Sequence, residues 1–407
     1  MSAKPLIYLD NNATTMAAPE VVSAMTEMLS THYGNPSSLH HFARVAGAAV
    51  KHARTQLADL LGCRSAELLF TSGSTEAITT AFASAMSAKP GGHIVTTAVE
   101  HPAVLRNAEK YESSGSRLTL VPVDDGGQLS AEQFIAALSE DTALAAVMVA
   151  NNETGVVFPV EAIVEACRAR KIPVLLDASQ AAGKLPLDIK ALKPDYVAVS
   201  AHKFHGPKGI GALYLRRGAP FEPLLIGGGQ ERSRRSGTEN VPAIVAMGVA
   251  AQLAKQRLES GEMERLRILR DKLEAGILAT LPNARVNGRG ERLPNTLNVS
   301  FVHASGEAIL QHLDELGIAA SSSSACSSNE QEPSHVLRAM RVPESHIHGS
   351  MRVGLSAYTT DDEVDYLLSV LPRVIEQARA ASPFVGNDLA DDYVESSRKD
   401  DPLYCDC

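Results

Sequence analysis

Short apolar runs alternate with amphipathic helical stretches along the first 240 residues of this chain. Six runs rich in β-branched and other apolar residues predict buried strands, and Tyr196-Val197-Ala198-Val199 is typical of them. The others are Leu68-Leu69-Phe70 and residues 93–99, 118–121, 144–149 and 174–176. Helical spacing separates most of these strands. Such alternation predicts a largely parallel sheet that is covered by helices on both faces.

The alternation weakens after Pro242. Residues 243–281 have a mostly helical pattern, with an interruption predicted at Ser260-Gly261. Further on, residues 296–301 and 351–355 predict strands, while residues 307–316, 335–340 and 361–380 predict helices. This part is expected to form a smaller α+β unit. Residues 387–407 are acidic and poor in apolar side chains, which is typical of a disordered tail.

Composition excludes several classes of function. The chain has 407 residues, of which 44% are hydrophobic and 21% charged, as in ordinary soluble proteins. Its net charge of -9 and its lack of Trp argue against a nucleic-acid surface. No apolar run reaches membrane-spanning length, and the five scattered cysteines form no disulfide framework. We therefore expect a cytoplasmic protein that binds neither nucleic acid nor membrane.

Polar side chains follow five of the predicted strands, at the edge where ligands bind in parallel sheets. They are Ser72-Gly73-Ser74-Thr75, Glu100-His101, Asn151-Asn152, Asp177-Ala178-Ser179-Gln180 and Ser200-Ala201-His202-Lys203. The first is a glycine-containing turn that enters a helix, which favours phosphate binding; an ordinary helix cap explains it equally well. The glycine-rich motifs of nucleotide triphosphate and dinucleotide sites are absent from the sequence.

A lysine just past a buried strand is unusual, because its amine must either pair with a carboxylate or become a nucleophile. Together with a phosphate site and Asp177, Lys203 favours pyridoxal phosphate as the cofactor. The lysine would bind the cofactor covalently, and Asp177 would keep its pyridine nitrogen protonated. His101 would lie against the ring or move protons, although capping a helix is the commoner role of a lone histidine.

The ordered motifs of the chain are similar to those of the NifS-type cysteine desulfurases, in the class V aminotransferase group. The shared pieces run from Tyr8-Leu9-Asp10-Asn11-Asn12-Ala13-Thr14-Thr15 through Gly34-Asn35-Pro36, Glu100-His101-Pro102, Asn151-Asn152-Glu153-Thr154-Gly155, His202-Lys203, Gly237-Thr238-Glu239-Asn240 and Ser324-Ala325-Cys326 to Glu332-Pro333-Ser334-His335. The resemblance covers residues 6 to about 382. The nitrogen-fixation branch is the most similar one.

The resemblance implies a fold-type I pyridoxal-phosphate enzyme of the α/β class, whose large domain has a mostly parallel seven-stranded sheet. The large domain would span residues 15–260. Residues 1–14 and 261–382 would form the smaller α+β domain that carries the cysteine loop, and residues 383–407 would be a flexible acidic tail. The site would be completed in a homodimer, because Thr238 would reach the cofactor phosphate of the other subunit.

The resemblance also assigns roles to the strand-end residues. Lys203 would hold the cofactor, and Asp177 would pair with its ring nitrogen. Gln180 would contact the ring hydroxyl, and His101 would lie against the ring face. The phosphate would be bound by Ser74, Thr75, Ser200 and His202. Asn152 would contact both cofactor and substrate, Arg352 would bind the substrate carboxylate through a bidentate pair, and Asn35 would assist. The implied catalytic residues are Cys326, Lys203 and His101.

Cys326 would be the nucleophile that removes sulfur from L-cysteine, giving L-alanine and a persulfide. The persulfide would pass to an iron–sulfur scaffold protein for cluster assembly, with nitrogenase maturation as one destination. No standing metal site is implied, beyond a transient iron–sulfur contact of Cys326. The terminal Cys405-Asp406-Cys407 could receive sulfur, or could have no role.

Three positions depart from the family pattern: Ser323 replaces a glycine, Thr79 an asparagine and Ser233 a glycine. These changes affect rate and loop dynamics rather than the reaction type. Two other functions stay open. One is a related lyase or transaminase that acts on selenocysteine or another amino acid, and the other is a non-catalytic assembly scaffold. A transaminase needs no thiol at position 326, and a scaffold needs none of Lys203, Asp177 and His101.

Overall fold

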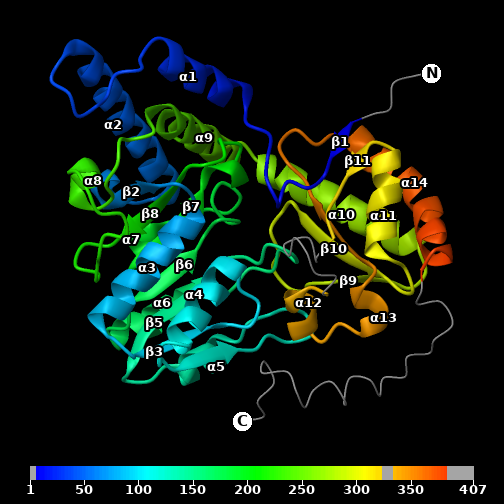
Figure 1. Cartoon of the computed structure of the whole chain (residues 1–407). Coiled ribbons are helices and arrows are strands. Elements are labelled where there is room, and N and C mark those ends of the chain that lie inside the picture. Colours follow the sequence, from blue (N-terminus) through cyan, green and yellow to red (C-terminus); the bar gives the residue numbers. More distant parts are fainter. Residues whose placement is uncertain (1–5, 323–332, 383–407) are drawn as a thin grey trace.

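The computed structural model describes residues 6–322 and 333–382, and its larger part is built on a seven-stranded sheet (Figure 1). The strand order is β2-β8-β7-β6-β5-β3-β4. The strands are β2 (Leu68–Thr71), β3 (His93–Thr97), β4 (Leu118–Val121), β5 (Thr142–Met148), β6 (Val174–Asp177), β7 (Tyr196–Ser200) and β8 (Gly211–Leu215). The expectation of a largely parallel sheet is confirmed, since only the pairings of β8 are antiparallel.

Strand β8 is the one member of this sheet that the sequence pattern does not predict. It follows the turn Gly206-Pro207-Lys208-Gly209 and returns alongside β7, where Ser200 faces Gly211. Its sequence, Gly-Ala-Leu-Tyr-Leu, contains no β-branched residue and begins with the two smallest side chains. The local signal is therefore weak, and pairing with β7 and β2 on either side determines the strand.

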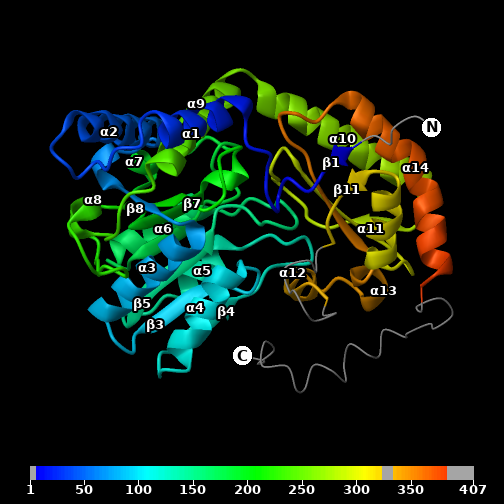
Figure 2. The same cartoon turned by 45° about the horizontal axis from the view of Figure 1, so that its top comes forward.

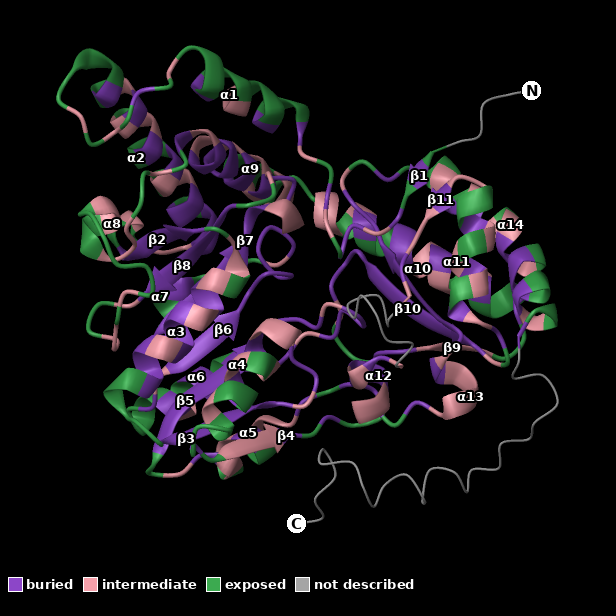
Figure 3. Cartoon of the chain, in the orientation of Figure 1, coloured by how far each residue is buried: buried purple, intermediate pink, exposed green. Residues whose placement is uncertain are grey.

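Alternate residues of each strand enter two different hydrophobic cores. Tyr196 and Ala198 pack against α3 (Ser74–Ala88) and α4 (Pro102–Glu112), whereas Val197 and Val199 face the other side of the sheet. Helices on that second side are α2 (His41–Leu61), α5 (Ala131–Ala137), α6 (Val160–Ala169) and α9 (Val241–Glu259). Burial on both faces explains why the strands consist of continuous apolar runs. Figure 3 shows these strands buried between helices with exposed outer surfaces.

The remaining elements of the larger part are short or peripheral. Helix α1 (Pro19–Ser30) packs beside α9, and the others are η1 (Ser65–Glu67), α7 (Ile189–Leu192), η2 (Ala201–Lys203) and α8 (Gln230–Ser233). Helix α2 ends where Gly62 takes a left-handed conformation. Of these elements, η2 matters most for function, because it directly follows β7 and carries Lys203 at its last position.

A third hydrophobic core lies mainly in the C-terminal part of the chain. It is formed by α10 (Glu262–Thr280), α11 (Gly306–Glu315) and α14 (Asp361–Ala380) around the antiparallel sheet β12-β10-β9. The strands are β9 (Ala284–Val286), β10 (Thr296–Phe301) and β12 (Ser350–Gly354), and a separate parallel pair joins β1 (Ile7–Tyr8) to β11 (Ile318–Ala319). Helices α12 (His335–Ala339) and α13 (Glu344–Ile347) bury Val336, Leu337 and Ile347 in the core of the large sheet instead.

Two connections join the parts. Helices α9 and α10 follow one another along one side of the molecule (Figure 2), and they are separated at Ser260-Gly261, where Gly261 has a φ of 81°. This confirms the predicted interruption. The second connection is the N-terminal segment, which leaves β1 and reaches the carboxyl ends of the large sheet's strands. Within the described ranges, no helix combines the length and apolarity needed to cross a bilayer.

Candidate active site

Most of the predicted site residues meet at the carboxyl edge of the large sheet, where the N-terminal segment crosses the strand ends. Both the backbone N–H and the side-chain Oγ1 of Thr15 donate to the carbonyl oxygen of His202, at 2.9 Å each. Asn12 donates through Nδ2 to the carbonyl oxygen of Asn152 and to Thr296 Oγ1. The segment is therefore held to both parts of the chain, and it closes one side of the site.

A cavity of about 310 Å³ lies at the N-terminus of α3. It is lined by Thr14, Ser72, Gly73, Ser74, Thr75, Ser200, His202, Lys208 and Gly209. Gly73 precedes the helix and supplies no side-chain cap, so the first amides of the helix point at the cavity without that competitor. Amides, hydroxyls and the nearby Lys208 ammonium together suit an anion.

His202 takes part in this cavity as a neutral ring. Burial, followed by the positive charges of Lys203, Lys208 and Lys184, lowers its pKa to about 4. Its Nδ1 lies 3.2 Å from Thr14 Oγ1. A neutral imidazole offers one donor and one acceptor, so His202 would donate to an anion rather than pair with it as a charge.

Lys203 projects from η2 toward the N-terminal segment. Its Nζ donates to the carbonyl oxygens of Asn12, at 2.7 Å, and Ala13, at 2.9 Å. A carbonyl carries no net charge, so these bonds hold the amine in place without the strong stabilisation of its charge that a carboxylate gives. The geometry leaves Lys203 at the strand-end edge that the sequence predicts for it.

Asp177 is the last residue of β6, and Gln180 lies on the turn that follows. Asp177 is buried, and its Oδ1 accepts hydrogen bonds from the N–H of Ser179, at 2.9 Å, and from Ser179 Oγ, at 2.5 Å. The Gln180 amide lies between two partners, because Nε2 donates to Asn12 O and Oε1 accepts from Lys184 Nζ. Both side chains are thus fixed by neighbours before any ligand binds.

His101 and Glu100 follow β3. The His101 Nδ1 accepts from the N–H of Ala103 at 3.1 Å, so the ring caps α4, and a neutral ring then carries its proton on Nε2. Burial lowers the pKa of His101, against the opposing effect of Asp177. Burial also raises the pKa of Glu100 to about 8. His101 is therefore neutral, with its donor nitrogen free of the capping interaction.

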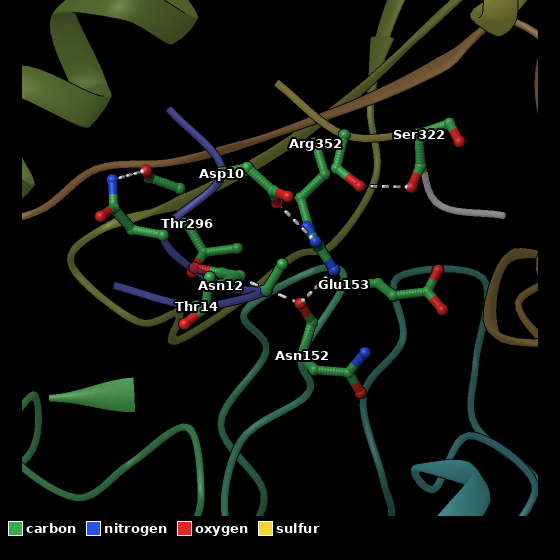
Figure 4. A network of polar contacts seen from close by, with 12 residues as sticks. Asp10, Asn12, Thr14, Asn152, Glu153, Thr296, Ser322 and Arg352 are labelled. Atoms are coloured by element: carbon green, nitrogen blue, oxygen red, sulfur yellow. Dashed lines mark hydrogen bonds and ion pairs between the residues drawn. The ribbon is translucent and has the colours of Figure 1, made fainter. Parts of the chain in front are cut away.

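Arg352 lies on β12 and is almost fully buried (Figure 4). Its Nη2 pairs with Asp10 Oδ1 at 2.8 Å, and its Nη1 donates to the carbonyl oxygen of Asn152 at 3.3 Å. Among the described residues, Arg352 Nε and Asn152 Oδ1 are buried without a hydrogen-bond partner. Unpaired buried polar atoms are costly, so each of these two atoms suits a polar ligand.

Two predicted residues lie away from this group, and one falls outside the described ranges. Asn35 is exposed in the loop between α1 and α2, where its Oδ1 accepts from the N–H of Ser37. Thr238 is also exposed and does not line the 310 Å³ cavity. Cys326 and Ser323 lie in the segment 323–332, outside the described residues. Cys405 and Cys407 also lie outside them, in the segment 383–407.

The structure adds residues that sequence reasoning missed. Asp10 and Asn12 belong to the first shared motif but had no predicted role in the site, yet they bind Arg352 and Lys203 respectively. Lys184, which carries no motif signal, is buried against Gln180. The proximity of Asp10 to Arg352, 342 positions apart in the sequence, has no local signal that could have revealed it.

The described cysteines do not offer a reactive thiol. Cys63 and Cys167 are both free, and burial raises the pKa of each thiol to about 12. Their thiols are therefore protonated and unreactive near neutral pH. In the ranges 6–322 and 333–382, no three His, Cys, Asp or Glu side chains are grouped so as to hold a metal ion.

Comparison with known proteins identifies relatives along nearly the whole chain. Residues 7–367 match the family model of aminotransferase class-V. Cysteine desulfurase 2 of Trichormus variabilis is 50% identical over 390 residues, which cover 95% of this chain and 97% of the relative. Cysteine desulfurase NifS of Azotobacter vinelandii is 48% identical over 381 residues, or 93% and 94% of the two chains. A solved NifS-like protein is 36% identical with a TM-score of 0.86, covering 92% of this chain and 100% of its own.

Proposed function

This chain belongs to the aminotransferase class-V family, and we propose that it is a pyridoxal-phosphate-dependent cysteine desulfurase. It would remove sulfur from L-cysteine, giving L-alanine and a persulfide on Cys326. The observation that carries this proposal is the 48–50% identity with cysteine desulfurases over more than nine tenths of the chain. The fold-type I architecture agrees with it.

The residues at the strand ends fit pyridoxal phosphate. The cavity at the N-terminus of α3 would take the phosphate through Ser74, Thr75, Ser200 and His202. Asp177 would pair with the ring nitrogen, and Lys203 would bind the cofactor covalently. Gly73 supports the fit, because it leaves the helix N-terminus uncapped and open to an anion. When bound, the cofactor withdraws electrons from the bonds at the substrate's α-carbon.

Arg352 would bind the substrate carboxylate. Asp10 holds one terminal nitrogen of the guanidinium and the Asn152 carbonyl holds the other, so the group is fixed in orientation before the substrate arrives. Its unpaired Nε and the unpaired Oδ1 of Asn152 would be satisfied by the amino acid. Asn35 is a further candidate for substrate binding.

His101 would hold or move a proton at Nε2, since its Nδ1 is engaged with the N–H of Ala103. Cys326 would supply the reacting thiolate. An S–S bond forms between its sulfur and the substrate sulfur while the substrate's Cβ–S bond breaks. The electron pair stays with the carbon, which is protonated to give alanine.

We also propose a homodimer whose second subunit contributes Thr238. Large apolar side chains are exposed around α1 and α2: Val22, Leu29, Tyr33, Leu39 and Phe42. Ile226, in the segment that precedes Thr238, is 91% exposed. Apolar side chains gathered in this way are typical of protein–protein interfaces. The persulfide would pass to an iron–sulfur scaffold protein in the cytoplasm, and similarity to NifS favours nitrogenase cluster maturation.

The decisive experiment incubates the purified, cofactor-loaded protein with L-cysteine and no other thiol. We expect alanine and persulfide on Cys326 in equal amounts, stopping after one turnover. Cys326→Ala should lose both products and keep the bound cofactor. Cys63→Ala is the matched control and should behave like wild type, because the Cys63 thiol is buried and protonated.

The same experiment separates the alternatives. Continued desulfuration by Cys326→Ala would refute the thiol mechanism and favour a lyase or transaminase of different substrate preference. Wild-type protein that binds cofactor but releases no alanine with any amino acid would favour the scaffold.

A further inference from the structure

Lys184 is a buried cation for which the proposed reaction has no use. It lies on the turn after β6, only 8% exposed, four residues beyond Gln180. The N–H groups of Lys184 and Leu185 both donate to the carbonyl oxygen of Ala181, and the intervening Gly183 has a φ of 76°, so the chain folds back at this turn. This placement brings Lys184 Nζ to 2.8 Å from Gln180 Oε1.

The two neighbours of the Gln180 side-chain amide determine where its oxygen and its nitrogen lie. The Lys184 amine, charged or neutral, has N–H groups to donate, and one of them donates to the amide oxygen at 2.8 Å. A carbonyl oxygen can only accept, so the atom facing Asn12 O, at 2.9 Å, must be the nitrogen. Because Lys203 Nζ donates to the same Asn12 oxygen, the Gln180 N–H₂ group is directed to the side of the site where Lys203 lies.

Positive groups surround Lys184 on several elements. Burial, followed by the charges of Lys203 on η2 and Arg352 on β12, lowers the pKa of Lys184 to about 7. Lys184 in turn lowers the pKa values of His202 and His205. Arg257 of α9 lines the same small cavity as Lys184. These neighbours favour the neutral form of the amine, which still has N–H groups to donate to Gln180 Oε1.

We propose that Lys184 is a positioning residue, which locks the Gln180 amide so that an N–H of Nε2 faces the cofactor's ring oxygen. Asn12 O uses one of the two Nε2 hydrogens, and the second is left for that oxygen. This proposal rests on the proposed function, since it needs a pyridoxal cofactor at Lys203. A donated hydrogen bond stabilises the ionised ring oxygen, and thereby lowers the pH at which the cofactor's bond to Lys203 loses its proton.

The test is a double-mutant cycle between Lys184→Met and Gln180→Ala, read from the pH midpoint of the bound cofactor's visible absorbance. Methionine keeps the length and apolar stem of lysine but cannot donate. We expect Lys184→Met to raise the midpoint by about one pH unit in the Gln180 background, and by less than about a third of that in Gln180→Ala. Lys184→Leu, which also lacks a donor, serves if the methionine variant does not fold.

The outcomes separate a positioning role from other roles. An equal shift in both backgrounds would mean that Lys184 acts through its charge alone, and would overturn the proposal, as would no shift in either. Wild-type protein that binds no pyridoxal phosphate would overturn the proposed function itself. The stability of the cofactor-free protein gives a further readout. The pKa of Lys184 is lowered to about 7 in the folded state, so between about pH 7 and 10.5 the unfolded state binds one proton more. The free energy of unfolding should therefore rise with pH in this range, and it should rise less in Lys184→Met than in wild type.

Discussion

Replacing Glu100 by glutamine should make the protein more stable at alkaline pH while leaving it unchanged at acidic pH. The Glu100 carboxyl is fully buried, and its Oε1 accepts from Thr97 Oγ1, at 2.8 Å, and from the Met148 N–H, at 3.0 Å. Its Oε2 has no partner among the described residues. Glutamine can keep the acceptor and place its N–H₂ where the proton of the neutral acid would lie.

The magnitude follows from the pKa of Glu100. Burial, with a smaller contribution from the nearby Asp177 charge, outweighs the hydrogen bonds from Met148 and Thr97 and raises it from 4.5 to about 8. The folded state therefore holds a proton that the unfolded state releases between these values. Stability from this group is fully present below pH 4.5 and is lost as the pH rises through 8. At about 1.4 kcal/mol per pKa unit, the loss is at most roughly 5 kcal/mol.

The assay is urea-induced unfolding of wild type and Glu100→Gln at pH 5.5 and pH 8.5, followed by circular dichroism. The free-energy difference between the two proteins should be small at pH 5.5 and should favour the variant by several kcal/mol at pH 8.5. Glu161→Gln, the same substitution on an exposed side chain, is the control and should show no such change. A difference between Glu100→Gln and wild type that does not vary with pH would refute the reasoning.

Two further substitutions test the packing and the substrate site. Gly211→Ala should lower the free energy of unfolding by about 1–3 kcal/mol, because its Cβ would lie 2.6 Å from the backbone of Gly73; thermal unfolding measures this. The control is Gly47→Ala on α2, whose Cβ would meet only Pro36 Cβ, at an ordinary contact distance of 4.0 Å, and it should not destabilise the protein. Asp10→Asn should raise KM for L-cysteine about tenfold with little change in kcat, because Arg352 loses its charged partner. Steady-state kinetics measure both constants, and an unaltered KM would contradict the proposed carboxylate site.

The alternation of apolar runs and helices was enough to predict the large sheet. Strands such as β7 are buried on both faces, so each carries an unbroken apolar run that identifies it without knowledge of its neighbours. The same rule placed the polar residues after each strand at one edge, and Ser200, His202 and Thr75 do line one cavity. It could not predict β8, whose small residues carry little local preference.

The sequence by itself determined which chemistry the chain can perform, because an amine at a strand end, a carboxylate and a thiol are properties of single residues and their motifs. The tertiary structure decided how these groups are held. It brought Asp10 to Arg352 across 342 residues, Lys184 to Gln180, and Asn12 to Lys203. Such contacts depend on burial and on the meeting of distant segments. Burial also sets the pKa values of Glu100 and Lys184, and no local pattern encodes it.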